Sequence, residues 1–159
     1  MSFRTAIARN TTALQPEYVR PPAGGRDAVF RFSVPVLRVR DVATTVAWYQ
    51  RHLGFVADAF PDHGAREFAI LERDGVQILV RRAPLADAQR KPDGHAGWDL
   101  YLWVDGLDFS RVQASLSLAG DIVRPISPMG SSMAELEVRD PDGYVLCIGG
   151  PMRGDVTLA

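Results

Sequence analysis

The stretch VPVLRVRDVATTVAWYQRHLGF, residues 34–55, predicts a strand that leads directly into a helix. Its first part alternates in polarity and is rich in β-branched residues, as expected of a half-buried strand. Asp41 can cap the helix that follows, and Gly54 can end it. Between these two residues, apolar side chains recur at the spacing of one helix face: Val42, Val46, Tyr49 and Leu53.

Three strands are predicted after this helix, and the whole order then returns. FVADAF is a short candidate strand, and REFAILER and VQILVRR flank the dipeptide DG, which is a hairpin signal. In the second half, WDLYLWV predicts a strand, LDFSRVQASLSLAG a helix, and DIVRPI, MAELEVRD and YVLCIGG three further strands. Matching points are almost equally spaced along the chain: Val39 and Val104, Gly54 and Gly120, Gly75 and Gly143. The sequence therefore contains two copies of a βαβββ unit.

This repeat predicts an α+β fold of two βαβββ modules in tandem, with mixed sheets curved around a shared concave cavity. We expect an N-terminal extension over 1–29, the first module over 30–82, a polar linker over 83–96, the second module over 97–150 and a tail over 151–159. The extension is either a partly ordered tail or a segment that packs on a partner subunit. Each helix would cover one face of its own sheet, so the opposite faces are left to line a ligand site.

Composition excludes several classes of function. The 159 residues include 18 basic and 19 acidic ones, for a net charge of −1, whereas nucleic-acid binders usually carry a basic excess. No window reaches the roughly 18 apolar residues of a membrane span. One cysteine, Cys147, allows no internal disulfide. We expect a cytoplasmic protein that binds neither nucleic acid nor membranes.

Strand alternation selects the side chains that face the predicted cavity. If Leu100 and Leu102 pack on the helix, then the opposite face of that strand carries a carboxylate and two rings. The candidate ligand-binding residues are Val36, Arg38, Phe60, Asp99, Tyr101, Trp103, Glu135 and Glu137. The same reasoning lines the first half of the cavity with Val34, Glu67, Ala69, Leu71, Gln77, Leu79 and Arg81.

Each of these residues also has a purely structural explanation. Tyr101 and Trp103 could fill the concave face as core, and Asp99 could bond a backbone group near the strand start. Glu135 and Glu137 could lie on a solvated rim; if buried, they need Arg38, Arg81, water or a cationic ligand as partners. Trp98 is expected to cover an edge or a subunit contact. Cys147 is expected to be a small buried apolar residue.

Three stretches carry a resemblance to a known family. The opening strand and helix (34–55), LYLWVDGLD (100–108) and EVRDPDGYVLCI (137–148) resemble the vicinal oxygen chelate superfamily. This superfamily includes glyoxalase I, extradiol dioxygenases, fosfomycin-resistance enzymes and bleomycin-resistance proteins, and the last group is the most similar. The resemblance extends over about residues 32–150.

The resemblance implies four metal-ligand positions, which metal-dependent members fill with His and Glu. In this chain they correspond to Val34, Leu79, Asp99 and Cys147. Valine and leucine cannot coordinate a metal, and the three histidines lie in loops or at a helix end. We therefore expect no metal, no cofactor and no catalytic residue of the superfamily type.

The leading functional hypothesis is a non-catalytic binder of the bleomycin-resistance type that sequesters a drug-like or cationic aromatic compound. The resemblance also implies a homodimer. The near-neutral charge departs from the acidic character of bleomycin-resistance proteins, which argues against bleomycin itself. Two alternatives stay open: a glyoxalase- or dioxygenase-like lyase or isomerase, with metal or with Asp99 or Glu137 as a metal-free general base, and a partner protein whose cavity is filled.

Overall fold

Within the residues that the structure describes, each half of the chain forms a four-stranded sheet with one helix. The computed structural model describes residues 32–84, 97–105, 109–117, 121–129 and 133–151. The first module contains β1 (Val36–Val39), α2 (Val42–Leu53), β2 (Val56–Phe60), β3 (Phe68–Arg73) and β4 (Val76–Arg82). The second contains β5 (Leu100–Trp103), α3 (Phe109–Ser117), β6 (Ile122–Met129), β7 (Met133–Arg139) and β8 (Val145–Pro151).

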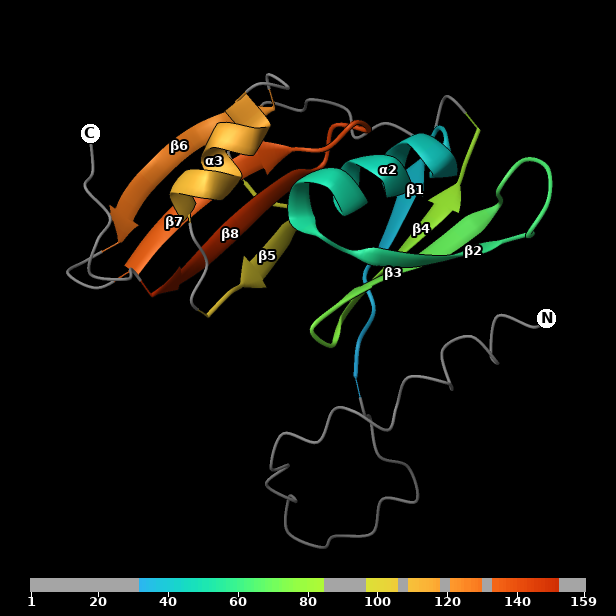
Figure 1. Ribbon diagram of the computed structural model, residues 1–159, viewed down its shortest axis with the longest axis horizontal. Coiled ribbons are helices and arrows are strands. Elements are labelled where there is room, and N and C mark those ends of the chain that lie inside the picture. Colours follow the sequence, from blue (N-terminus) through green and yellow to red (C-terminus); the bar gives the residue numbers. More distant parts are fainter. Residues whose placement is uncertain (1–31, 85–96, 106–108, 118–120, 130–132, 152–159) are drawn as a thin grey trace, which may run out of the picture.

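The two sheets have the same topology. Their strand orders are β1-β4-β3-β2 and β5-β8-β7-β6. In each sheet the first strand pairs in parallel with the last, and the remaining pairs are antiparallel. The α+β fold and the internal duplication are thereby confirmed (Figure 1).

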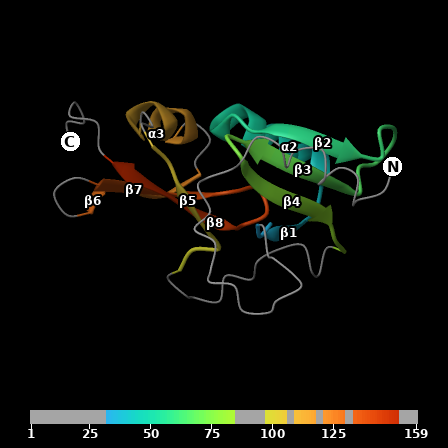
Figure 2. The ribbon, with the colours of Figure 1, turned by 90° about the horizontal axis from the view of Figure 1, so that it is seen from below.

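Both helices lie on the same side of the two sheets, and Figure 2 shows them together above the strands. The structure brings α2 and α3 into contact with each other. The helix-facing sides of the sheets form one hydrophobic core, and its largest fully buried side chains are Tyr49, Leu71, Ile78, Leu116, Leu136, Leu146 and Ile148. The opposite sides, which we call the free faces, are covered by neither of the described helices.

The termini of α2 follow the sequence signals. Asp41 accepts a hydrogen bond from the Thr44 backbone N–H at 2.7 Å, which satisfies a donor that the helix start leaves unpaired. Gly54 ends the helix with a φ of 66°, a left-handed conformation that costs glycine little. In the hairpin between β3 and β4, Asp74 and Gly75 both have positive φ, as this tight turn requires.

The predicted faces of β3 are wrong. Ala69 and Leu71 were expected in the cavity, but both are fully buried in the helix-side core, where they pair with Val80 and Ile78. Glu67 precedes the strand. The antiparallel register instead aligns Phe68 and Ile70 with Arg81 and Leu79, so these residues share the free face. A shift of one residue exchanges the two faces of a strand.

The turn between β7 and β8, residues 140–143, packs on the start of the first module. Asp142 accepts hydrogen bonds from the Arg40 backbone N–H at 2.8 Å, the Arg40 Nε at 3.2 Å and the Thr45 hydroxyl at 2.7 Å. The Tyr49 hydroxyl donates to Asp140 at 3.3 Å. We call this contact the first junction. It ties α2 and the end of β1 to the second module through buried carboxylates.

Several expectations lie outside the described residues: the extension over 1–29, most of the linker over 83–96, and all but the first residue of the predicted tail. Among the described helices, none is long and apolar enough to cross a membrane.

Candidate functional site

Three aromatic side chains project from β5 and the residues before it. Trp98, Tyr101 and Trp103 are 46%, 40% and 52% exposed, although large rings are usually buried. The ring centroids of Trp98 and Tyr101 lie 5.2 Å apart at an interplanar angle of 55°. The orientation of Tyr101 and Trp103 agrees with the alternation of β5. Trp98, which was expected to cover an edge or a subunit contact, lies just before the edge strand β5 with its ring against that of Tyr101. We call these three residues the aromatic platform.

Each ring of the aromatic platform donates a hydrogen bond to a carboxylate. Trp98 Nε1 donates to Glu137 at 2.9 Å, and the Tyr101 hydroxyl donates to Glu135 at 3.1 Å. Trp103 Nε1 donates to Asp105 at 3.1 Å. Desolvation and the bond to Glu135 raise the pKa of Tyr101, so its hydroxyl stays a donor near neutral pH. The rings are therefore held in place without a ligand.

Gly149 makes room for the Tyr101 ring. A Cβ on Gly149 would lie 2.1 Å from the Tyr101 hydroxyl oxygen and 3.3 Å from the Glu135 side chain. No side chain can occupy that space while the Tyr101–Glu135 hydrogen bond exists. The glycine pair at the end of YVLCIGG was a signal for this close approach.

The two glutamates share one arginine. Arg124 Nε donates to Glu137 at 2.8 Å, and Arg124 Nη2 donates to Glu135 at 3.0 Å. Glu135 is only 3% exposed, so it does not lie on a solvated rim. Sequence reasoning proposed Arg38 or Arg81 as partners and missed Arg124. The register of β6 with β7, which places Arg124 opposite Glu137, is what brings them together.

Cys147 lies directly below this network. It is fully buried and is aligned with Tyr101 on one side and Glu137 on the other. Burial, together with the charges of Glu135 and Glu137, raises the pKa of the thiol to about 12. A thiol with that pKa is protonated at neutral pH and is not an activated nucleophile. The residue serves as a small apolar side chain.

Asp99 anchors β8 to β5. Its carboxylate accepts the Val145 backbone N–H at 2.8 Å, and its own N–H donates to the Val145 carbonyl at 2.8 Å. These two bonds extend the parallel ladder of β5 and β8 by one position. The structural explanation for Asp99, a bond to a backbone group near the strand start, therefore holds.

The candidates of the first module lie on the free face of the other sheet. Val36 is 54% exposed and Arg38 is also exposed, and they align with Leu79 and Arg81 of β4. Phe60 stacks on Phe68 with centroids 5.4 Å apart. The candidate set therefore divides into an apolar and basic group on the first sheet and the aromatic and acidic group on the second.

The residues at the four superfamily ligand positions do not fit a metal ion. The side chains of Val34 and Leu79 have no donor atoms and Asp99 is bonded to the backbone, which leaves the buried Cys147 as the one remaining donor of the four. Among the described residues, no group of three or more His, Cys, Asp or Glu side chains is arranged to hold a metal. The donor set thus lacks the converging oxygen and nitrogen ligands that a divalent cation needs.

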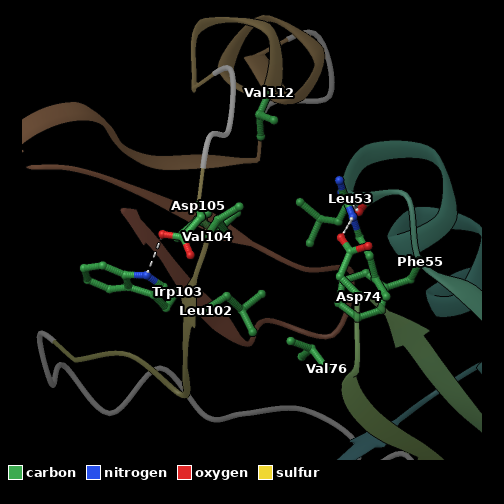
Figure 3. Close-up of a pocket in the computed structure, with 11 residues that line it drawn as sticks. Leu53, Phe55, Asp74, Val76, Leu102, Trp103, Val104, Asp105 and Val112 are labelled. Atoms are coloured by element: carbon green, nitrogen blue, oxygen red, sulfur yellow. Dashed lines mark hydrogen bonds and ion pairs between the residues drawn. The ribbon is translucent and has the colours of Figure 1, made fainter. Parts of the chain in front are cut away.

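A cavity of about 350 Å³ opens between the modules, next to the aromatic platform (Figure 3). Its walls come from the end of α2, the β3–β4 hairpin, the end of β5, α3 and β8. The lining residues are Leu53, Phe55, Arg73, Asp74, Val76, Leu102, Trp103, Val104, Asp105, Val112 and Ile148. Trp103 is the one member of the predicted site among them. Sequence reasoning did not locate this cavity.

A family model described as the glyoxalase/bleomycin resistance protein/dioxygenase superfamily matches residues 31–148. No match to a curated protein was found.

Solved structures with the same architecture come from several bacteria. TioX from Micromonospora sp. ML1 is 25% identical with a TM-score of 0.60, over 81% of this chain and 100% of its own. A glyoxylase/bleomycin resistance protein/dioxygenase domain from Frankia sp. EAN1pec is 21% identical with a TM-score of 0.62, over 80% and 96%. The fosfomycin resistance protein FosX from Listeria monocytogenes is 12% identical with a TM-score of 0.60, over 79% and 96%.

Proposed function

Because the chain belongs to the glyoxalase/bleomycin resistance protein/dioxygenase superfamily, we propose that it is a binding protein that sequesters a flat, drug-like or cationic aromatic molecule. The superfamily contains both enzymes and binding proteins, so the choice between these two functions has to be argued from the geometry of the site. One neighbour in fold, FosX, is a resistance protein, which is consistent with a role directed at a small toxic compound.

The observation that carries this proposal is the aromatic platform. Three rings are exposed, and each is fixed by a hydrogen bond to a carboxylate. A ring that is already fixed loses little side-chain entropy when a ligand stacks on it, which preserves affinity. Stacking between aromatic rings contributes about 0.5–1.5 kcal/mol beyond the area it buries.

The charges around the platform favour a cation. Glu135 and Glu137 share one guanidinium, that of Arg124, so their cluster keeps one negative charge. Asp105 adds another beside Trp103. An aromatic ligand with a positive charge would gain from both the ring faces and these carboxylates. Binding would need neither a metal nor a cofactor.

We also propose a homodimer in the cytoplasm. Several large apolar residues of the first module are exposed, among them Val36, Val56 and Phe60. A second copy over this free face would bury them. The single buried thiol is compatible with a reducing compartment.

Tryptophan fluorescence tests the binding proposal directly. The chain has three tryptophans, of which Trp98 and Trp103 belong to the platform and Trp48 is buried in α2. In the Trp48→Phe variant, titration with planar cations, bleomycin included, should quench the emission with saturation. The Trp98→Phe/Trp103→Phe variant, which reports through Trp48 alone, is the control and should respond weakly. No response to any planar compound in the first variant would overturn the proposal.

Two glycine variants separate the platform from the stability of the fold. Gly149→Ala should displace the Tyr101 ring and weaken ligand binding about tenfold, roughly 1.4 kcal/mol, because the new Cβ occupies the position of the hydroxyl. Gly97→Ala is the matched control, since no atom lies within 4 Å of its new Cβ. Equal affinity of both variants would show that the ligand does not use Tyr101.

The enzymatic alternative has its own readout. Stoichiometric Ni, Zn, Mn or Fe in the purified protein, together with turnover of methylglyoxal–glutathione adducts, would replace the binding proposal by a metal-dependent one. Turnover without metal that is lost in Glu137→Gln would replace it by a general-base mechanism.

A further inference from the structure

The two modules meet at a second junction that is equivalent to the first by the internal repeat. Gly143 in the turn of the first junction corresponds to Gly75, and both have positive φ, 93° and 84°. The turn of Asp74 and Gly75 lies beside the end of β5, just as the turn over 140–143 lies beside the end of β1. The cavity of about 350 Å³ occupies this second junction.

The residues that close the first junction are replaced at the second. In the repeat, Arg40 corresponds to Asp105 and Asp142 to Asp74, so an ion pair becomes two like charges. Tyr144, whose hydroxyl bonds the backbone of Arg38, corresponds to Val76. The second junction therefore lacks both the ion pair and the tyrosine that close the first, and a cavity is left in their place.

The walls of this space are apolar. Leu53, Leu102, Val104, Val112 and Ile148 contribute aliphatic surface, and Figure 3 shows Val112 pointing into the space from α3. The volume is within the range of small-molecule sites, and an apolar cavity with a few polar groups at its mouth is their usual form.

The polar groups at the mouth are mostly acidic. Asp74 and Asp105 are exposed carboxylates, and Arg73 is the one cation among the lining residues. Arg73 already donates to the Leu53 carbonyl and to Asp74. One net negative charge therefore remains at the mouth of an apolar cavity.

We propose that the second junction is a binding site for a compact apolar amine, with its hydrocarbon part between α2 and α3 and its ammonium group at Asp74 and Asp105. This site is distinct from the free face of the second sheet. Trp103 borders both, so the test relies on residues that line the cavity alone.

A size-matched probe series tests the proposal: 1-naphthylmethylamine, 1-naphthalenemethanol and 1-naphthoic acid, titrated into methyl-labelled protein and followed by NMR. The amine should shift the methyl signals of Val76, Val104 and Val112 with saturation, and the acid should bind at least fivefold more weakly. Val112→Phe, which fills the cavity, should weaken the amine at least tenfold. Val123→Phe, the same change at a 40% exposed position on β6 outside the cavity lining, should leave its affinity unchanged.

Val76→Phe provides a second filled variant at the partly exposed start of β4, should Val112→Phe not fold. Trp98→Ala and Tyr101→Ala distinguish this site from the aromatic platform, because they should not change these methyl shifts. Equal affinity in the wild type and in a folded filled variant would overturn the proposal. So would an absence of shifts at the lining methyls, or equal binding of the acid and the amine.

Discussion

The two junctions between the modules are built from equivalent segments and differ in what fills them. At the first junction, Asp142 accepts three hydrogen bonds, and the buried Tyr49 donates one to Asp140. Both buried carboxylates are therefore hydrogen-bonded. At the second, equivalent positions carry Asp105, Asp74 and Val76 around an apolar cavity. Equivalent segments of the two βαβββ units therefore join the modules at the first junction and leave a cavity between them at the second.

This difference separates stability from function. A buried carboxylate whose partners are removed is costly, so the first junction tolerates little change. Exposed carboxylates at the mouth of a cavity contribute little to folding and can vary. Mutations at equivalent positions should therefore have unequal effects.

The largest difference is expected for Asp142→Asn against Asp74→Asn. Asp142→Asn removes the negative charge to which the Arg40 guanidinium and the Thr45 hydroxyl donate hydrogen bonds. It should lower the free energy of unfolding by about 2–3 kcal/mol. Asp74 pairs only with Arg73 at the surface, and its φ of 48° suits asparagine, so Asp74→Asn should cost less than about 0.5 kcal/mol. Urea denaturation of both variants measures this. Equal losses would contradict the contrast between the junctions.

The duplicated fold was predictable because its signals are local. Asp41 and Gly54 define α2, and a glycine-containing turn defines the last hairpin of each module. The faces of β3 were not predictable, because residues 68–71 are all apolar. Their sequence does not show which of them point toward the core. Only the pairing of Ile70 with Leu79 fixes which side faces the core.

The side chains of the site were predictable where alternation along a single strand determines the face on which they lie. Alternation placed Tyr101, Trp103 and Glu137 on one face, although their role in binding stays a prediction. Trp98 and Arg124 were missed because their partners are on other strands, and β6 has register shifts that the sequence does not reveal. The cavity was missed because it shows only when the two junctions are compared, where Val76 takes the position of the Tyr144 that bonds Arg38.

The next largest effect is a pH dependence confined to the first junction. Burial raises the pKa of Asp140 from 3.8 to about 6, despite two backbone N–H bonds that lower it. The folded state therefore binds this proton more tightly than the unfolded state does. The stability from this group is complete below about pH 4 and is lost as the pH rises through 6, an effect of about 2–3 kcal/mol.

Comparison with Asp140→Asn isolates this contribution. The free energy of unfolding of the wild type, relative to that of the variant, should rise as the pH falls from 7 to 4. Denaturation at several pH values measures the difference. A difference that does not change with pH would show that Asp140 titrates alike in both states.

A smaller loss is expected from Tyr49→Phe. The variant keeps the ring that packs against Phe55 and removes the hydroxyl that donates to Asp140. The variant loses a buried hydrogen bond to a carboxylate. Because this bond is long, at 3.3 Å, its loss should lower the free energy of unfolding by about 1 kcal/mol. It should also shift the pH dependence of Asp140 upward, because this bond lowers that pKa. Denaturation at pH 4 and 7 detects both, and an unchanged pH profile would argue against the contact.

The smallest effect should come from giving the second junction the charge pattern of the first. Asp105→Arg places a guanidinium at the position that corresponds to Arg40, on the cavity that Asp74 also lines. Both positions are exposed, so the new pair should stabilise the fold by at most about 0.5 kcal/mol, and high salt should remove the gain. The same change reverses the charge at the mouth of the cavity and should weaken amine binding. If the stability gain were as large as the loss in Asp142→Asn, burial would not be what distinguishes the two junctions.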